Sequence, residues 1–262
     1  MKQTLIELSA VLVATGQTSF ATGEMAKLLG ISGARERVLI RDLIGTGSLT
    51  RVQRGRYLLR PPKLRSKVWS PTEALTLKSL IVDAGGQYQL CGPIAFQHYG
   101  WDDQIPNRVH AYNNLISGER AVGNVALTLI KVDTLRLGAT EASLTPEAVE
   151  FVWPTRARAL MDAVYDWSVF NSLPRGYDWI RRELSRYDAL AADLVEVSRQ
   201  FANQGTLRRI GKLLEIASAP PGLLRKLERS LNRSTSFIPW DPSRPKRGVI
   251  DRRWGVVFNH ES

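Results

Sequence analysis

Residues 22–44 read as two short helices joined by a tight turn. Residues 22–29 carry the first helix, and Gly30 and Ser32 form a turn in which Ser32 can cap the helix over residues 33–44. Apolar residues in this second helix recur at helical spacing. The residues that this spacing turns inward are Leu39, Leu43 and either Ile40 or Ile44.

An arginine-rich hairpin follows the second helix. Residues 49–53 and 56–59 are short extended runs, and Arg54-Gly55 between them supplies a tight turn that tolerates positive φ. With a further helix expected over residues 3–14, the order is helix, helix, tight turn, helix and two-stranded ribbon. This order predicts a winged helix-turn-helix over residues 1–60.

In such a fold the third helix enters the major groove of DNA and the ribbon, or wing, lies along the phosphates. If Leu39 and Leu43 point inward, Arg37 and Arg41 lie one turn apart on the outer face. Arg35 is near the N-terminal end of the helix, where base edges are usually met. The expected phosphate-contacting residues of the wing are Arg51, Arg54 and Arg56. Two alternatives stay open: a hairpin whose charges only protect a solvated edge, and a winged helix that docks onto protein.

The charge distribution favours the DNA-binding interpretation. The 262 residues carry a net charge of +11, and residues 1–67 hold 12 Lys and Arg against 4 Asp and Glu. A basic excess at one end is typical of a module that binds a polyanion. The single cysteine, Cys91, excludes an internal disulfide, and no apolar run is as long as a membrane span. These features predict a cytoplasmic protein without membrane association.

Behind a basic, proline-containing linker at residues 61–68, residues 69–262 are expected to form a larger domain of mixed α/β structure. The whole chain is therefore assigned to the α+β class, without an order for the strands. Expected strands lie at 125–133, 148–153, 236–240 and 254–259. Expected helices lie at 155–166, 178–187, 189–200, 207–217 and 223–232.

No group of residues in this region predicts catalysis. Cys91 and His98 lie on either side of Gly92-Pro93, and a lone cysteine in an apolar stretch is more often a core residue than a nucleophile. The three histidines lack metal-ligand spacing. Gly205 and Gly211-Lys212 resemble a phosphate loop only faintly, since the spacing is one residue too long. The sequence predicts no enzyme activity, no metal and no cofactor.

Basic residues recur near the C-terminus and form a candidate second basic surface. Its members are Arg208, Arg209, Lys212, Arg225, Lys226, Arg229 and Arg233. They are interpreted either as solvated helix faces or as a second surface for nucleic acid.

Five segments, in order, resemble the AbiEi antitoxins of bacterial type IV toxin–antitoxin systems. They are "GSLTRVQRGRYLL" (47–59), "SPTEAL" (70–75), "WPTRARALMDAV" (153–164), "ANQGTLRRIGKLLE" (202–215) and "FIPWDPSRPKRGVIDRRWGVVFN" (237–259). The resemblance implies an autorepressor that binds inverted repeats in promoter DNA through Ser32, Arg35, Arg37 and Arg41 on the helix and through the wing arginines. It also implies that the C-terminal domain counters a nucleotidyltransferase toxin, with or without forming a stable complex, and it supplies no catalytic residue.

Two other functions stay open beside the antitoxin interpretation. A ligand-sensing transcriptional regulator would show an apolar pocket lined by Trp101, Tyr99 or Trp167. A restriction-like nuclease would show clustered acidic residues beside a lysine on a strand.

Overall fold

The computed structural model describes residues 2–15, 19–60, 69–232 and 236–259. Helices and strands are mixed along the chain, as the α+β assignment predicted. The chain forms two compact units. The first comprises Met1–Leu90, Pro106–Leu137 and Ala142–Val152; the second comprises Cys91–Ile105, Gly138–Glu141 and Trp153–Ser262.

The expected linker at 61–68 lies outside the described residues. The first unit joins residues 1–60 to later segments, so the grouping differs from the expected division of the chain. Whether residues 1–60 fold as a domain of their own stays a prediction. No helix among the described residues is both long enough and apolar enough to cross a lipid bilayer.

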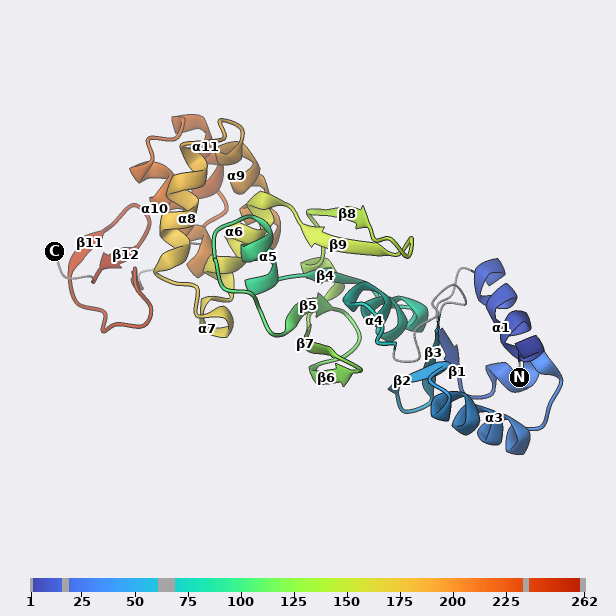
Figure 1. Ribbon diagram of the computed structural model, residues 1–262. Helices are drawn as coiled ribbons and strands as arrows, with labels where there is room; N and C mark the ends of the chain where they lie inside the picture. Colours follow the sequence, from blue (N-terminus) through green and yellow to red (C-terminus); the bar gives the residue numbers. More distant parts are fainter. Residues whose placement is uncertain (1, 16–18, 61–68, 233–235, 260–262) are drawn as a thin grey trace. The chain divides into compact units, whose positions relative to one another are not determined.

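The N-terminal part of the first unit has the element order of a winged helix-turn-helix (Figure 1). Its strands form an antiparallel sheet in the order β1-β3-β2, and a cluster that includes Leu8, Phe20 and Leu43 fills its core. The first strand was not predicted from the sequence. The elements are α1 (Lys2–Thr15), β1 (Ser19–Ala21), α2 (Glu24–Leu29), α3 (Gly33–Gly45), β2 (Leu49–Gln53) and β3 (Arg56–Leu59).

The rest of the first unit centres on a four-stranded sheet in the order β4-β5-β7-β6. Its β5–β7 pair is parallel and the other pairs are antiparallel. The strand expected at 125–133 is β7, an interior strand whose residues are alternately buried and half-exposed. The elements are α4 (Glu73–Leu80), β4 (Tyr88–Leu90), β5 (Val109–Asn113), β6 (Gly118–Val122) and β7 (Val125–Lys131), with short 3-10 turns at Val82–Ala84 and Thr134–Arg136.

A two-stranded sheet of β8 (Thr140–Leu144) and β9 (Glu150–Pro154) follows, and the boundary between the units falls within both strands. The strand expected at 148–153 corresponds to β9, shifted by one or two residues.

The second unit is mainly helical, and α6 is its central helix (Figure 1). Eight of the ten residues of α6 are buried, and the helix packs against α8, α9 and α10. A small sheet in the order β10-β12-β11 packs against α10. The elements are α5 (Pro93–His98), α6 (Arg156–Tyr165), α7 (Trp167–Phe170), α8 (Arg175–Leu184), α9 (Leu190–Phe201), α10 (Gln204–Ile216), α11 (Pro221–Glu228), β10 (Ile238–Pro239), β11 (Val249–Asp251) and β12 (Val256–Phe258).

Candidate nucleic-acid interface

The α3 helix turns a narrow face inward and leaves most of its surface exposed. Ser32 caps the helix by accepting a hydrogen bond from the backbone N–H of Arg35 at 3.3 Å, as the sequence predicted. Ile40 and Leu43 are buried and Leu39 is half-buried. The choice left open between the two isoleucines is thereby resolved in favour of Ile40.

The three arginines of α3 do not share one side of the helix. Arg37 and Arg41 are exposed and lie one turn apart. Arg35 is also exposed but lies on the opposite flank, where it lines a groove of about 380 Å³ together with Glu7 and Asp42. The structure therefore separates Arg35 from the other two arginines.

Glu36 is a buried carboxylate that the sequence analysis missed. It is 2% exposed, and its two oxygens accept hydrogen bonds from the backbone N–H of Gly23 at 2.8 and 3.0 Å. One oxygen also accepts from the N–H of Ala26 at 3.2 Å. Because Gly23 has no side chain to cap α2, Glu36 of α3 satisfies these N-terminal donors instead. A single carboxylate thus fixes the two helices of the helix-turn-helix to each other.

The wing is a tight hairpin whose tip is tied to the segment before α2. Gln53 pairs with Arg56, and Gly55 between them has φ of 79°. The carbonyl of Gly55 accepts hydrogen bonds from the N–H of Thr22 at 2.7 Å and from its hydroxyl at 3.3 Å. Glycine suits this position because other residues rarely adopt positive φ.

The wing arginines divide into two groups. Arg51 and Arg54 are exposed. Arg56 is half-buried, and its guanidinium donates a hydrogen bond to the hydroxyl of Ser19 at 3.1 Å. That hydroxyl in turn donates to the carboxylate of Asp83 at 2.7 Å. Arg56 is therefore partly engaged within its own unit, unlike the other two.

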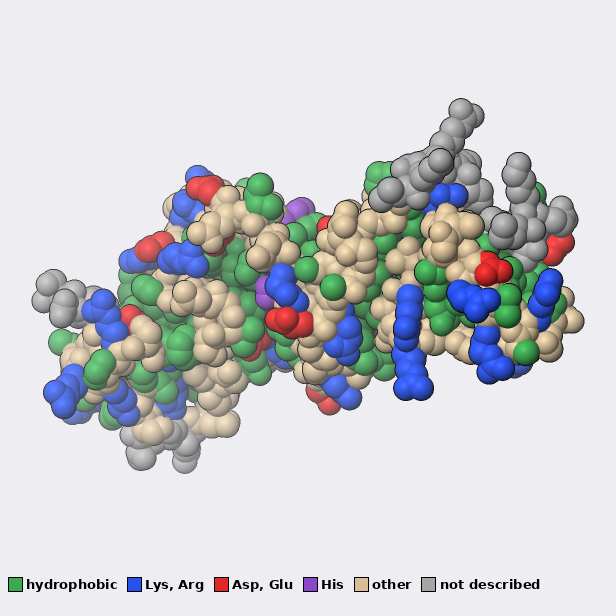
Figure 2. All heavy atoms as spheres, turned by 60° about the horizontal axis from the view of Figure 1, so that its bottom comes forward, with side chains coloured by type: hydrophobic (Ala, Val, Ile, Leu, Met, Phe, Trp, Pro, Cys, Tyr) green, Lys and Arg blue, Asp and Glu red, His purple; other side chains and the backbone are tan. Residues whose placement is uncertain are grey.

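The resulting surface is basic. Figure 2 shows lysine and arginine side chains standing out from the winged helix, at the right of the view, with few acidic side chains between them. Among the described residues, Arg37, Arg41, Arg51 and Arg54 make one ion pair, between Arg41 and Asp42 at 3.8 Å. Both of these side chains are more than half exposed, so the pair contributes little to stability.

The candidate second basic surface is not assembled as expected. Arg208 and Arg209 are each only 7% exposed, so their assignment to a surface is wrong. Their guanidinium groups donate to backbone carbonyls, Arg208 to Ser236 at 2.8 Å and Arg209 to Pro239 at 3.0 Å. These two arginines fasten the C-terminal segment to α10.

The other members of that surface differ among themselves. Lys212 is largely enclosed by ion pairs with Glu215 at 2.8 Å and Asp251 at 2.6 Å. Burial alone would lower the pKa of Lys212, but its hydrogen bonds with Asp251 and Glu215 raise the pKa above its usual value. The exposed members are Arg225, Lys226 and Arg229, and Arg233 lies outside the described residues.

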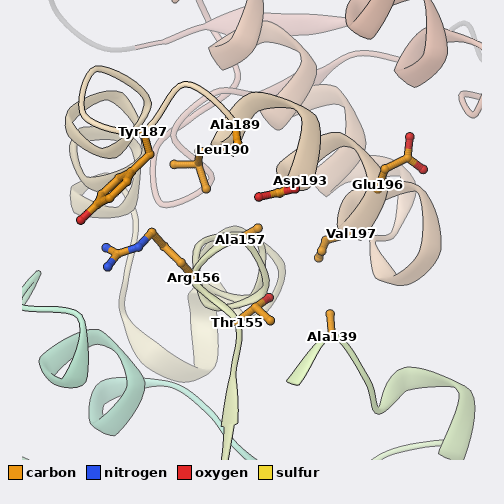
Figure 3. Close-up of a pocket in the computed structure, with 10 residues that line it drawn as sticks. All are labelled: Ala139, Thr155, Arg156, Ala157, Tyr187, Ala189, Leu190, Asp193, Glu196 and Val197. Carbon is orange, nitrogen blue, oxygen red and sulfur yellow. The ribbon is translucent and has the colours of Figure 1, made fainter. Parts of the chain in front are cut away.

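A groove in the second unit lies between the beginning of α6 and α9 (Figure 3). It has a volume of about 510 Å³ and an apolar floor that includes Ala157, Leu190 and Val197. At one end of the groove, the guanidinium carbon of Arg156 lies 4.5 Å from the centroid of the Tyr187 ring. The aromatic residues expected around a ligand pocket, Trp101, Tyr99 and Trp167, do not line this groove.

Cys91, His98 and Gly211, the weak catalytic candidates of the sequence, are each packed against other parts of the protein. Cys91 is buried, and the ring of His98 stacks on Trp153 with centroids 3.9 Å apart. Gly211 lies in α10 directly against Trp254. Within the described part of the chain, no three His, Cys, Asp or Glu residues are grouped so that they could hold a metal ion.

Comparisons with known proteins bear on the fold. No protein-family model matches the sequence, and no curated protein matches it. Among solved structures, the chain is similar to the crystal structure of the RV2827C protein from Mycobacterium tuberculosis, with a TM-score of 0.56. The two are 14% identical, and the similarity covers 97% of this chain and 90% of that chain. At this identity the similarity concerns the fold alone.

Proposed function

We propose that this protein binds double-stranded promoter DNA and represses its own operon, with α3 in the major groove and the wing along the phosphates. The observation that carries the proposal is the set of four exposed arginines, Arg37, Arg41, Arg51 and Arg54, on these two elements. A winged helix docked onto a protein would have little need for such a surface. DNA phosphates are the partner whose charge complements it.

The wing assignment is tested by the salt dependence of binding. Each phosphate contact contributes about −0.9 to the slope of log K against log salt, so R51A/R54A should flatten the slope by about 2. Because phosphate contacts carry no sequence information, this variant should weaken specific and random DNA alike. The slope is measured by fluorescence anisotropy of the full chain at several salt concentrations.

A matched control separates local contacts from overall charge. R225A/R229A removes the same two charges from exposed positions on or next to α11. The slope of this variant should equal that of the unchanged protein. An equal slope in R51A/R54A and the unchanged protein would contradict the wing assignment. A flatter slope in R225A/R229A would extend the interface to the second unit.

The helix arginines should behave differently from the wing. R37A and R41A should each lose about 1–3 kcal/mol of binding free energy on the cognate site, because a bidentate contact to a base carries sequence information. Binding to random DNA should change less. Equal losses on both DNAs would make Arg37 and Arg41 phosphate contacts.

We further propose that the protein is the antitoxin of a type IV toxin–antitoxin pair and counters a nucleotidyltransferase toxin. The support is the resemblance of five segments, in order, to AbiEi antitoxins. Three of these segments lie within residues 153–259. The test is co-expression of the full chain with a nucleotidyltransferase toxin, after which surviving colonies are counted. The R37A/R41A variant should still rescue growth if neutralisation does not require DNA binding. Absence of rescue by the unchanged chain would refute the antitoxin role and leave the DNA-binding proposal standing.

A further inference from the structure

One exposed stripe of α3 combines charged and apolar side chains. Ala34, Arg37, Val38 and Arg41 follow the spacing i, i+3, i+4 and i+7, which places them on one side of a helix. The buried residues Glu36, Ile40 and Leu43 lie on the other side. Val38 is 40% exposed and lies at the edge of this stripe, beside the groove that Glu7 and Asp42 line.

Val38 is not a buried core residue of α3, although it lines the groove together with Leu29 and Leu39. A β-branched residue is a weaker helix former than alanine, glutamate or lysine. The deeper apolar contacts of α3 are made by Ile40 and Leu43, which are 7% and 0% exposed. Val38 therefore leaves part of its apolar surface in water next to Arg37 and Arg41.

The N-terminal end of the same stripe is open to close approach. A Cβ atom built on Gly33 would meet nothing within 4 Å, and its φ does not require glycine. Packing and backbone conformation thus leave this glycine unexplained in the free protein. With Ala34 as its neighbour, Gly33 leaves the beginning of α3 without a bulky side chain at these two positions, which suits insertion of this end of the helix into the major groove.

One flank of the stripe carries two acidic groups and one arginine. Glu7, Asp42 and Arg35 line the groove beside Val38, whereas Arg37 and Arg41 lie toward the other flank. Two acids against one arginine leave that groove with a net negative charge, so phosphates are drawn to Arg37 and Arg41 instead. When the helix lies in a major groove, Val38 then faces the floor of the groove, where base edges are displayed.

We propose that Val38 reads a thymine by packing its isopropyl group against the C5-methyl group in the major groove. This inference rests on the proposed DNA-binding function and adds the base that the helix selects. Thymine alone presents a methyl group there, and apolar side chains recognise it by contact. Arg37 and Arg41 beside it donate to guanine or phosphate, so the site combines one apolar contact with charged ones.

The test removes one methyl group from each partner. The full chain is used to select high-affinity duplexes from a random-sequence library, and each thymine of the selected site is then replaced singly by deoxyuridine. Dissociation constants are measured for the unchanged protein, V38A and I44A. Ile44 is the matched control because it is also 40% exposed on α3 but lies in the last turn.

One thymine is expected whose replacement weakens binding of the unchanged protein about fourfold, the equivalent of one buried methyl group. The same replacement should not affect V38A, and it should affect I44A as much as the unchanged protein. Equal uracil sensitivity in V38A and the unchanged protein at every thymine would overturn the inference while leaving specific DNA binding intact. A library that yields no enriched sequence would refute the proposed function and the inference together.

Discussion

At the scale of single residues, Glu36 shows how far a local pattern can mislead. A glutamate in the first turn of an amphipathic helix suggests a solvent-exposed charge near the positive end of the helix dipole. In the structure it is buried and accepts three backbone hydrogen bonds from the segment that begins α2. Nothing within α3 signals this, because the donors are 10 and 13 residues away.

Glu36→Ala should lower the free energy of unfolding of the first unit by about 3 kcal/mol, because backbone donors of Gly23 and Ala26 lose a buried acceptor. Chemical denaturation measures the loss of stability, and hydrogen exchange under native conditions shows whether α2 opens more easily. Asp42→Ala is the matched control: it also removes one acid from α3, but its side chain is 53% exposed, so stability should change by less than about 0.5 kcal/mol. Similar stabilities for the two variants would contradict the capping role.

At the scale of elements, periodicity predicted the helices well and the strands unevenly. The expected helices of the second unit each overlap an observed one, with ends shifted by up to a turn, and the wing has the expected strands. Both signals are local, since helical spacing and a turn glycine need no distant partner. The strand β6 (Gly118–Val122) was missed because it begins with glycine and exposes Glu119. It is a strand because it pairs with β7, which its own sequence does not encode.

The candidate site was predictable to a similar degree. The exposure of Arg37, Arg41, Arg51 and Arg54 follows from helix phase and strand position. The burial of Arg208 and Arg209 does not, because their acceptor carbonyls lie 28 and 30 residues further along the chain. From the sequence alone, a charged side chain is expected to face solvent. Only the tertiary contacts show that Arg208 and Arg209 are buried.

Helix α10 offers a test of element packing. A Cβ atom on Gly211 would lie 2.1 Å from the indole of the buried Trp254, so the helix can approach this ring only with glycine there. Gly211→Ala should lower the free energy of unfolding by about 3 kcal/mol, because the indole cannot move away in a packed core. Gly205→Ala is the control in the same helix, since its nearest neighbours are 3.4 Å from the added carbon. That variant should be unchanged or more stable by about 0.5 kcal/mol. Thermal unfolding of both variants is monitored by circular dichroism. Equal unfolding midpoints for Gly211→Ala and Gly205→Ala would contradict the close approach of α10 to Trp254.

At the scale of the whole molecule, the chain crosses between its two units several times. Cys91–Ile105 belongs to the second unit although the segments on either side of it belong to the first. This segment carries Phe96, whose ring lies 4.9 Å from that of Trp179 and 5.9 Å from that of Phe170. A short insertion thus completes the aromatic core of a unit otherwise built mainly from residues after 152. Sequence order alone could not have predicted this, since Phe170 and Trp179 lie more than 70 residues from Phe96.

We expect the two units to unfold separately, because each has its own buried core. Phe96→Ala should destabilise the second unit by about 3–4 kcal/mol through loss of the aromatic contacts, and Leu43→Ala should destabilise the first by about 3 kcal/mol. Hydrogen exchange followed by mass spectrometry distinguishes the units. In Phe96→Ala, exchange should accelerate in α6 and α8 and stay unchanged in α3; in Leu43→Ala, the pattern should be reversed. Acceleration of exchange in all these helices by either substitution would mean that the units unfold together.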